Sequence, residues 1–184
     1  LAEVLRAFDV GRLQESDCYF GGGTAISMLL GEYRESVDID FMCASGEGYR
    51  RLRNTVTPTD LGPLLKTPLK YLRDEVRTNE YKVFTILEMN EIPVKVGFVF
   101  EARIPLAGAL NAALGVPVLV RDDLYAEKLL ANADRGLDRA VLSRDVIDHL
   151  AMMMQGWGDI PETAWRKVLQ SYGKFSRPKR RGVG

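Results

Sequence analysis

Residue types that build several common kinds of site are scarce in this sequence of 184 residues. It contains two cysteines, too few for a scaffold held together by several disulfides, and one histidine, which gives no zinc-ligand pattern. It also lacks any run of about 18 apolar residues, the length that a membrane-spanning helix requires. Its 25 basic residues balance its 25 acidic residues, so the formal net charge is zero. These absences exclude a membrane protein and a disulfide-rich scaffold.

The composition that remains is that of a folded, globular protein. Apolar residues make up 46% of the chain and charged residues 27%, whereas disordered chains contain fewer apolar residues. The first ten residues include Glu3, Arg6 and Asp9, which the apolar core of a secretory signal would not contain. Cys18 and Cys43 are far apart in the sequence and lie among apolar residues. We therefore expect a cytoplasmic protein in which both cysteines are buried thiols.

The first part of the chain has the pattern of an α/β domain. Apolar residues at helical spacing predict a helix over Leu1–Val10, and a short apolar run predicts a strand over Cys18–Phe20. A second helix is expected over Thr24–Leu30, with Thr24 as its N-cap. Over Val37–Met42, apolar residues alternate with aspartates, which is the period of a strand.

A hairpin and then a run of helices come next. Glu75–Glu88 and Ile92–Glu101 have strand-like patterns and are separated by three residues. After residue 118 the apolar residues recur at helical spacing. We therefore divide the chain into a core (1–118), a helical segment that packs on it (119–173) and a basic tail (174–184). The tail has five basic residues and no acidic one, so it either reaches phosphates through charge attraction or is a solvated chain end.

Asp38 and Asp40 are the first candidates for a functional pair. Side chains two positions apart on a strand point to the same face, so the two carboxylates are expected close together. Two like charges at that distance are unfavourable unless a cation or a group of donors lies between them. Mg²⁺ prefers oxygen ligands of this kind and completes its coordination with substrate phosphates. The pair predicts a Mg²⁺ site, although a solvated sheet edge would show the same pattern.

The glycine turn Gly21-Gly22-Gly23, just before the helix expected at Thr24, is the second candidate. Backbone N–H groups and the positive end of a helix dipole bind phosphates at such a turn. The turn lacks the Lys-Ser/Thr of a Walker A loop and the spaced glycines of a dinucleotide fingerprint. A glycine turn, a short helix and a strand with two aspartates together supply the metal site and phosphate cradle of phosphoryl or nucleotidyl transfer.

These motifs resemble those of a known family. Phe20-Gly-Gly-Gly-Thr-Ala-Ile-Ser and Arg34-Glu-Ser-Val-Asp-Ile-Asp40 resemble the signature of DNA polymerase β-like nucleotidyltransferases. Asp123-Leu-Tyr-Ala-Glu-Lys128-Leu-Leu-Ala and Arg144-Asp145-Val-Ile-Asp148-His-Leu resemble later motifs of the AbiEii/MenT group of bacterial nucleotidyltransferase toxins. The resemblance covers about Tyr19 to Met154. It implies an α/β (α+β) polymerase β-like core with a mixed sheet, followed by a C-terminal helical segment that completes the cleft.

The resemblance also implies roles for the motif residues. Asp38 and Asp40 would be catalytic and hold Mg²⁺, or Mn²⁺ in its place. Lys128 would contact the phosphates of the NTP as a cation, and Asp145 or Asp148 would complete the catalytic site. Ser36 would touch a phosphate or cap a turn. The residues expected to face the triphosphate are Gly22, Gly23, Thr24 and Ser36.

The activity that the resemblance implies is transfer of a nucleoside monophosphate from an NTP to an acceptor hydroxyl, with release of pyrophosphate. The implied acceptor is the 3′ end of tRNA, and the implied setting is a toxin–antitoxin or phage-defence system with a cognate antitoxin protein. Arg50, Arg51 and Arg53 come after the second motif and either meet RNA phosphates or form a solvated helix face.

One position departs from the family pattern. A third carboxylate is usual on a later strand, where this sequence has Gly97. Glu101 shares that strand face but lies four residues further on, about 13 Å along a strand. Either two aspartates suffice, or Asp145 or Asp148 substitutes, or transfer is impaired. The alternatives are therefore a nucleotide-binding regulatory module with lost or weak transfer, and a nucleotidyltransferase that acts on protein.

Overall fold

A mixed sheet of eight strands forms the centre of the computed structural model, which describes residues 1–134 and 147–175. The strands are β1 (Cys18–Gly21), β2 (Asp38–Cys43), β3 (Lys70–Tyr71), β4 (Arg77–Thr78), β5 (Lys82–Met89), β6 (Ile92–Phe100), β7 (Gly108–Asn111) and β8 (Val116–Leu119). Their order is β3-β5-β6-β2-β1-β8-β7, with β4 paired to β5. β2 runs parallel to β6 and antiparallel to β1. The expected α/β core with a mixed sheet is confirmed.

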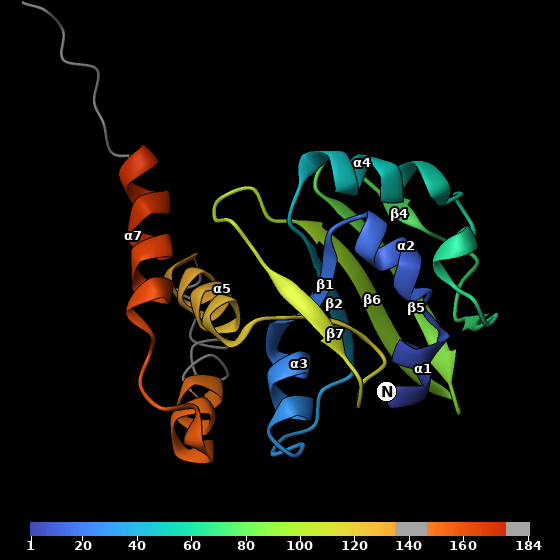
Figure 1. Cartoon of the computed structure of the whole chain (residues 1–184). Coiled ribbons are helices and arrows are strands. Elements are labelled where there is room, and N and C mark those ends of the chain that lie inside the picture. Colours follow the sequence, from blue (N-terminus) through green and yellow to red (C-terminus); the bar gives the residue numbers. More distant parts are fainter. Residues whose placement is uncertain (135–146, 176–184) are drawn as a thin grey trace, which may run out of the picture.

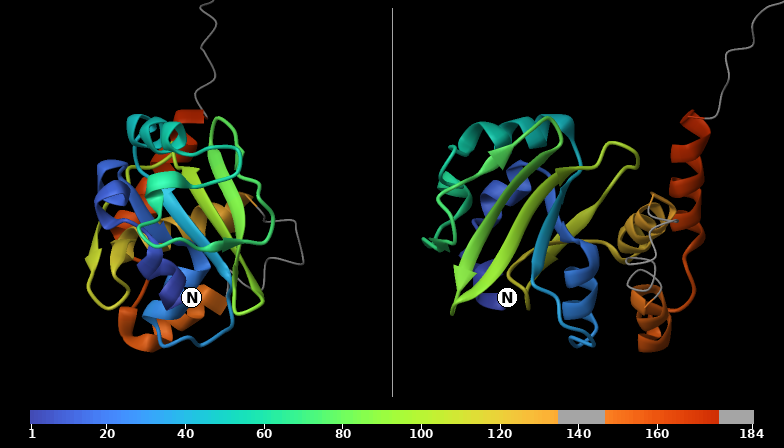
Figure 2. Two further views of the ribbon diagram at one scale, coloured as in Figure 1. Left: turned by 90° about the vertical axis from the view of Figure 1, so that its right-hand side faces the viewer. Right: turned by 180° about the vertical axis from the view of Figure 1, so that it is seen from behind.

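Helices pack on the sheet and beside it. They are α1 (Ala2–Ala7), α2 (Val10–Glu15), α3 (Gly22–Leu29), α4 (Gly46–Thr55), the 3₁₀ turn η1 (Gly62–Leu64), α5 (Arg121–Asp134), the π-helical turn η2 (Met153–Trp157) and α7 (Glu162–Phe175), with a further helical stretch over residues 147–152. Figures 1 and 2 show α2 and α4 over one face of the sheet, whereas α5 and α7 pack on each other beside the sheet, next to α3. Among the described residues, no helix is long and apolar enough to cross a membrane.

Successive side chains of β2 point alternately into the core and to the opposite face of the sheet. Phe41 is fully buried, stacks on Phe98 with ring centroids 5.1 Å apart, and meets the edge of Phe8 at the same distance. Asp38 and Asp40 lie on the opposite face of the strand, since side chains alternate along it. The strand predicted over Val37–Met42 is therefore confirmed, one residue further along the chain. Its polar face is turned towards α5.

Two predicted helices differ from those observed. The single helix expected over Leu1–Val10 is interrupted at Phe8, which is extended, and α2 begins after Asp9. The Asp9 carboxylate accepts a hydrogen bond from the Arg12 N–H at 2.8 Å, so it caps a new helix. The prediction that Thr24 is an N-cap is wrong, because α3 begins at Gly22 and its N-cap is Gly21.

The hairpin and the helical segment largely agree with the sequence pattern. β5 and β6 pair as predicted, and Asn90 and Glu91 turn the chain with φ of +50° and +66°. The stretch expected over Glu75–Glu88 is divided into β4 and β5, and the short β7 was not predicted. α7 continues to Phe175, and the rest of the basic tail lies outside the described residues.

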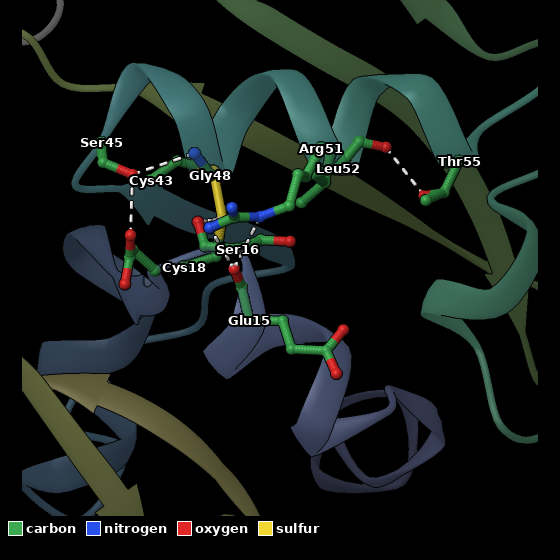
Figure 3. The surroundings of a disulfide bond; sticks show 10 residues. Glu15, Ser16, Cys18, Cys43, Ser45, Gly48, Arg51, Leu52 and Thr55 are labelled. Carbon is green, nitrogen blue, oxygen red and sulfur yellow. Dashed lines mark hydrogen bonds between the residues drawn. A yellow bond between two sulfur atoms is a disulfide. The ribbon is translucent and has the colours of Figure 1, made fainter.

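A disulfide between Cys18 and Cys43 joins β1 to β2 (Figure 3). The two residues are directly opposite in the antiparallel pairing, with Cα atoms 4.1 Å apart, and both side chains are fully buried. The expectation of two thiols is therefore wrong, because a separation of 25 residues in sequence does not prevent two strands from pairing. Figure 3 shows the bond beneath α4, whose N-cap Ser45 accepts a hydrogen bond from the Gly48 N–H at 2.9 Å.

Reduction of this disulfide is expected to lower the free energy of unfolding by about 3 kcal/mol, because the bond constrains the unfolded chain. For a protein of this size the thermal midpoint should fall by roughly 6 to 12 °C. Thermal unfolding with and without a reductant measures the effect. A Cys18→Ala, Cys43→Ala double variant is the control, since reductant should not change its midpoint. An unchanged midpoint in the unmodified protein would show that the bond does not stabilise the fold.

Candidate active site

A cavity of about 380 Å³ lies between the polar face of the sheet and α5. Its floor includes three alternate residues of β2 (Asp38, Asp40 and Met42) and Val99 of β6, and its roof consists of residues that share one face of α5. The polar side chains that line it are Thr24, Arg34, Ser36, Asp38, Asp40, Lys82, Glu101, Arg103, Glu127, Lys128 and Asp134. Residues that lie as far apart in the sequence as Gly22 and Asp134 therefore meet around one space.

Asp38 and Asp40 place their carboxylates on the floor of the cavity. Asp40 lies between two glycines, since a Cβ atom on Gly22 would be 3.5 Å from its Oδ2 and one on Gly97 would be 2.9 Å from its Oδ1. Oδ1 of Asp38 is buried and has no hydrogen-bond partner among the described residues, and the Lys95 ammonium is 3.9 Å away. A buried carboxylate oxygen without a donor is suited to a cation.

The two aspartates therefore fit a divalent metal. Their oxygens match the donors that Mg²⁺ and Mn²⁺ prefer. Within residues 1–134 and 147–175, no group of three or more Asp, Glu, His or Cys side chains forms a metal site. Mg²⁺ commonly binds to proteins through only one or two carboxylates, with phosphate oxygens and water as its other ligands. The donor set is that of a metal shared with a phosphorylated substrate.

The glycine turn places the start of α3 at one end of the cavity. Gly22 has φ of +70°, a left-handed conformation that glycine adopts without strain. The N-terminus of α3 has no side-chain cap, so its first N–H groups face the cavity end without a competing acceptor from the N-cap. The hydroxyls of Thr24 and Ser36 lie 2.5 Å apart beside this turn and also line the cavity.

Asp148 is fully buried and accepts hydrogen bonds from three side chains. The donors are Tyr33 Oη at 2.5 Å, Arg34 Nε at 2.7 Å with Nη2 at 3.0 Å, and Lys128 Nζ at 2.5 Å. A Cβ atom on Gly23 would overlap Arg34 Nη2 and lie 3.3 Å from Lys128 Nζ. The two cationic groups therefore lie directly over the glycine turn, and Asp148 holds them there.

The titration of this cluster is explained by its contacts. Burial alone would raise the pKa of Asp148, but the hydrogen bonds from Arg34 and the charge of Lys128 outweigh burial and hold the pKa below its usual range. Burial and the hydrogen bond to Asp148 raise the pKa of Tyr33, so its hydroxyl stays a neutral donor. The hydrogen bond to Asp148 raises the pKa of Arg34. One anion between two cations leaves net positive charge at this end of the cavity.

Gly97 stands beside Asp40 in the parallel pairing of β2 with β6. The space that a side chain at this position would enter is bounded by Lys82 of β5, whose Cε would be 3.1 Å and Nζ 3.6 Å from an added Cβ. The strand position that carries a carboxylate in the family pattern therefore has an ammonium group close by. No carboxylate of β6 itself lies next to Asp40.

Gly97→Ala is expected to weaken binding of a divalent metal by about tenfold, a typical effect of disturbing the support of a ligand. The added Cβ would be 2.9 Å from Asp40 Oδ1, so the carboxylate must move. Titration with Mn²⁺, followed by electron paramagnetic resonance, measures the affinity. Gly173→Ala is the matched control, because a Cβ there would meet nothing within 4 Å. Equal affinities in the two variants would contradict the placement of Asp40 as a ligand.

The other end of the cavity is lined by three carboxylates around one guanidinium. Arg103 donates to Glu101 through Nη2 at 2.7 Å and Nε at 3.0 Å, and to Asp134 at 2.5 Å. Glu127, from α5, has a buried Oε1 that has no hydrogen-bond partner in the described part of the chain. Burial and the charge of Glu101 raise the pKa of Glu127 to about 8, while Arg103 opposes the shift.

Most of the site residues predicted from the sequence line this one cavity. They are Gly22, Gly23, Thr24, Ser36, Asp38, Asp40 and Lys128. Asp148 lies behind Lys128 and not on the cavity surface, and Asp145 is outside the described residues. Sequence reasoning assigned no role to Arg34 or Glu127, although both stood inside the motifs that it used. It also missed Lys82 and Arg103, for which the sequence offered no signal.

Comparisons with known proteins agree with this geometry. The family model described as "Nucleotidyl transferase AbiEii toxin, Type IV TA system" matches residues 4–182. The fold is similar to that of ANT(2″)-Ia in complex with adenylyl-2″-tobramycin, with a TM-score of 0.52 and 13% identity over 95% of this chain and 98% of that one. It is also similar to an antigenic nucleotidyltransferase-like protein from Paracoccidioides brasiliensis, with a TM-score of 0.51 and 12% identity over 94% and 88% of the two chains. Among curated proteins, no sequence matches significantly.

Proposed function

Because this chain belongs to the AbiEii family of nucleotidyl transferase toxins of type IV toxin–antitoxin systems, we propose that its cavity transfers a nucleoside monophosphate from an NTP to an acceptor hydroxyl. The observation that supports this most directly is the meeting, in one cavity, of two aspartates, the start of a helix and two cations. A triphosphate needs a metal on one side and donors on the other, and these residues supply both.

Asp38 and Asp40 would hold Mg²⁺, with Mn²⁺ as the alternative ion. When bound, the metal supplies positive charge to the phosphate oxygens. The two carboxylates would also position the α-phosphate, because both line the cavity floor. The acceptor hydroxyl would then enter from the side opposite the leaving pyrophosphate, as an in-line displacement requires.

Lys128 and Arg34 would bind the outer phosphates next to the first N–H groups of α3. Both cations would stabilise the negative charge that develops on pyrophosphate as it leaves. The hydroxyls of Thr24 and Ser36 would donate hydrogen bonds to phosphate oxygens at the same end. Asp148 would act as a positioning residue, since it contacts Lys128 and Arg34 and does not line the cavity.

For the acceptor we propose the 3′ end of tRNA, as the resemblance of the motifs implies, with an antitoxin as partner. Action in the cytoplasm is proposed from this acceptor, since the cysteines form a disulfide and no longer support that location. The arginines of α4 give the choice of tRNA no support. They do not line the cavity, and Arg51 instead donates to Glu47 at 2.6 Å and to the carbonyl oxygen of Glu15 at 2.8 Å. The choice of tRNA therefore depends on the motifs alone.

The test is a transfer assay with each of the four α-³²P-labelled NTPs, Mg²⁺ and total tRNA. Label is expected on RNA with at least one NTP, and EDTA should abolish it. Label on protein and not on RNA would favour transfer to a protein hydroxyl. NTP binding without transfer would favour a nucleotide-binding regulatory module, for which Gly97 in place of a carboxylate is the motivating observation.

A further inference from the structure

The proton of the acceptor hydroxyl needs a base, and the two cavity aspartates of the sheet, Asp38 and Asp40, are already assigned to the metal. Gly97 stands beside Asp40 where a carboxylate would otherwise lie. Glu101, on the same side of the sheet, binds the Arg103 guanidinium through both of its oxygens. Asp148 accepts hydrogen bonds from three side chains behind the cavity surface. Neither of these two carboxylates has an oxygen available to take a proton from a substrate.

Glu127 differs from them in its contacts. It lines the cavity from α5, immediately before Lys128, which lies at the end of the cavity near the glycine turn. Its Oε1 is buried, and among the described residues no donor reaches it. A buried carboxyl oxygen without a hydrogen bond costs free energy in the free protein. A ligand that supplies the missing hydrogen bond would remove this cost. An acceptor hydroxyl is a ligand of the required kind, because it can donate one hydrogen bond.

We infer, on the basis of the proposed function, that Glu127 is the general base of the transfer reaction and acts from helix α5 in place of a carboxylate on the sheet. The ionised Glu127 takes the proton of the acceptor hydroxyl while the hydroxyl oxygen forms a bond to the α-phosphorus. The bond from the α-phosphorus to the oxygen that bridges to the β-phosphate breaks, and pyrophosphate leaves with that electron pair. Release of the proton to solvent then restores the carboxylate.

The position of Glu127 is fixed by contacts made one helical turn earlier. Asp123 is fully buried, accepts a hydrogen bond from the Ala107 N–H at 2.7 Å, and forms an ion pair with Lys167 of α7. Residues four apart share one side of a helix, so these contacts also set the direction in which Glu127 points.

The charged groups around Glu127 give it a suitable pKa. Glu101 and Arg103 face it from the end of β6, and Asp123 and Asp134 face it from α5 itself. Burial and the three carboxylates raise its pKa to about 8, and the single guanidinium opposes them. A general base is most effective when its pKa lies near the working pH, because it must both accept and release the proton.

Glu127→Gln tests this inference, because the amide keeps the shape of the side chain and cannot take a proton. The single-turnover transfer rate is expected to fall by about 10² to 10⁴. NTP affinity, measured by calorimetry in the presence of Ca²⁺, should change less than about twofold, because the base contacts the acceptor and not the phosphates. Asp122→Asn is the matched control, since it removes one carboxylate from the same helix outside the cavity.

Two further readouts separate a base from a structural residue. The rate of the unmodified protein should rise with pH up to about 8, whereas the rate of Glu127→Gln should not. Added formate should restore part of the rate to Glu127→Ala. An unchanged rate in Glu127→Gln would overturn the inference, and so would equal losses of rate and NTP affinity. If the unmodified protein transfers no label to any acceptor, the proposed function itself fails, and the base fails with it.

Discussion

Asp40→Asn is expected to lower the rate of nucleotidyl transfer by about a thousandfold or more, and Asp38→Asn should do the same. Both aspartates line the cavity floor, and in the proposed mechanism each is a charged ligand of the metal, whose loss would remove several kcal/mol of transition-state stabilisation. A loss of about 4 kcal/mol corresponds to three orders of magnitude in rate. The labelled-NTP assay measures this directly.

Unlike the transfer rate, the thermal stability should not fall in these two variants. Neutralising one of two neighbouring carboxylates relieves their repulsion, so the thermal midpoint should stay the same or rise slightly. Asp74→Asn is a suitable control, because Asp74 is exposed and lies outside the cavity. Full activity in either Asp38→Asn or Asp40→Asn would remove that residue from the metal site.

Asp148→Ala is expected to lower the free energy of unfolding by about 3 to 5 kcal/mol, the typical loss when one partner of a buried ion pair is removed. The variant would leave Arg34, Lys128 and Tyr33 without their common acceptor in a site where Asp148 is fully buried. Urea unfolding measures the change. Asp134→Ala provides the comparison, because the Asp134 side chain is 51% exposed and its pair with Arg103 should contribute less than about 1 kcal/mol.

Because of the Asp148 carboxylate, the free energy of unfolding should fall at low pH. The pKa of Asp148 is lower in the folded protein than in the unfolded chain, where a free aspartate has a pKa of about 4. Its contribution is therefore complete above that pH and is lost as the pH falls through the folded-state value. Urea unfolding between pH 2 and pH 7 should show a smaller decline for Asp148→Asn than for the unmodified protein. Parallel curves would mean that other carboxylates cause the acid sensitivity.

The features that could be predicted well from the sequence depend on short-range patterns. The alternation around Asp38 and Asp40 has a period of two, and this period indicates both the strand and the shared face of the aspartates. The helix with Lys128 is indicated in the same way by its apolar spacing. The motif resemblance added the order in which these pieces occur, and the structure brings them into one cavity.

The features that could not be predicted depend on contacts between distant residues. Asp148 meets Arg34 across 114 positions of sequence, and periodicity shows only the face of a residue and not its partner. The disulfide was missed because its cysteines become neighbours only when β1 pairs with β2. Glu127 was not assigned because only a folded structure can show that its Oε1 is buried without a partner.

The contacts of Asp123 have a consequence for how the length of this chain can change over evolution. Each residue inserted into an α-helix rotates the later part of the helix by about 100°, so an insertion between Asp123 and Glu127 would turn both Glu127 and Lys128 away from the cavity. The turn between β7 and β8, at residues 112–115, can lengthen without rotating α5. Related chains should therefore vary in length at 112–115 and keep a constant length over 123–128, so that the absence of insertions marks the segment on which the proposed chemistry depends.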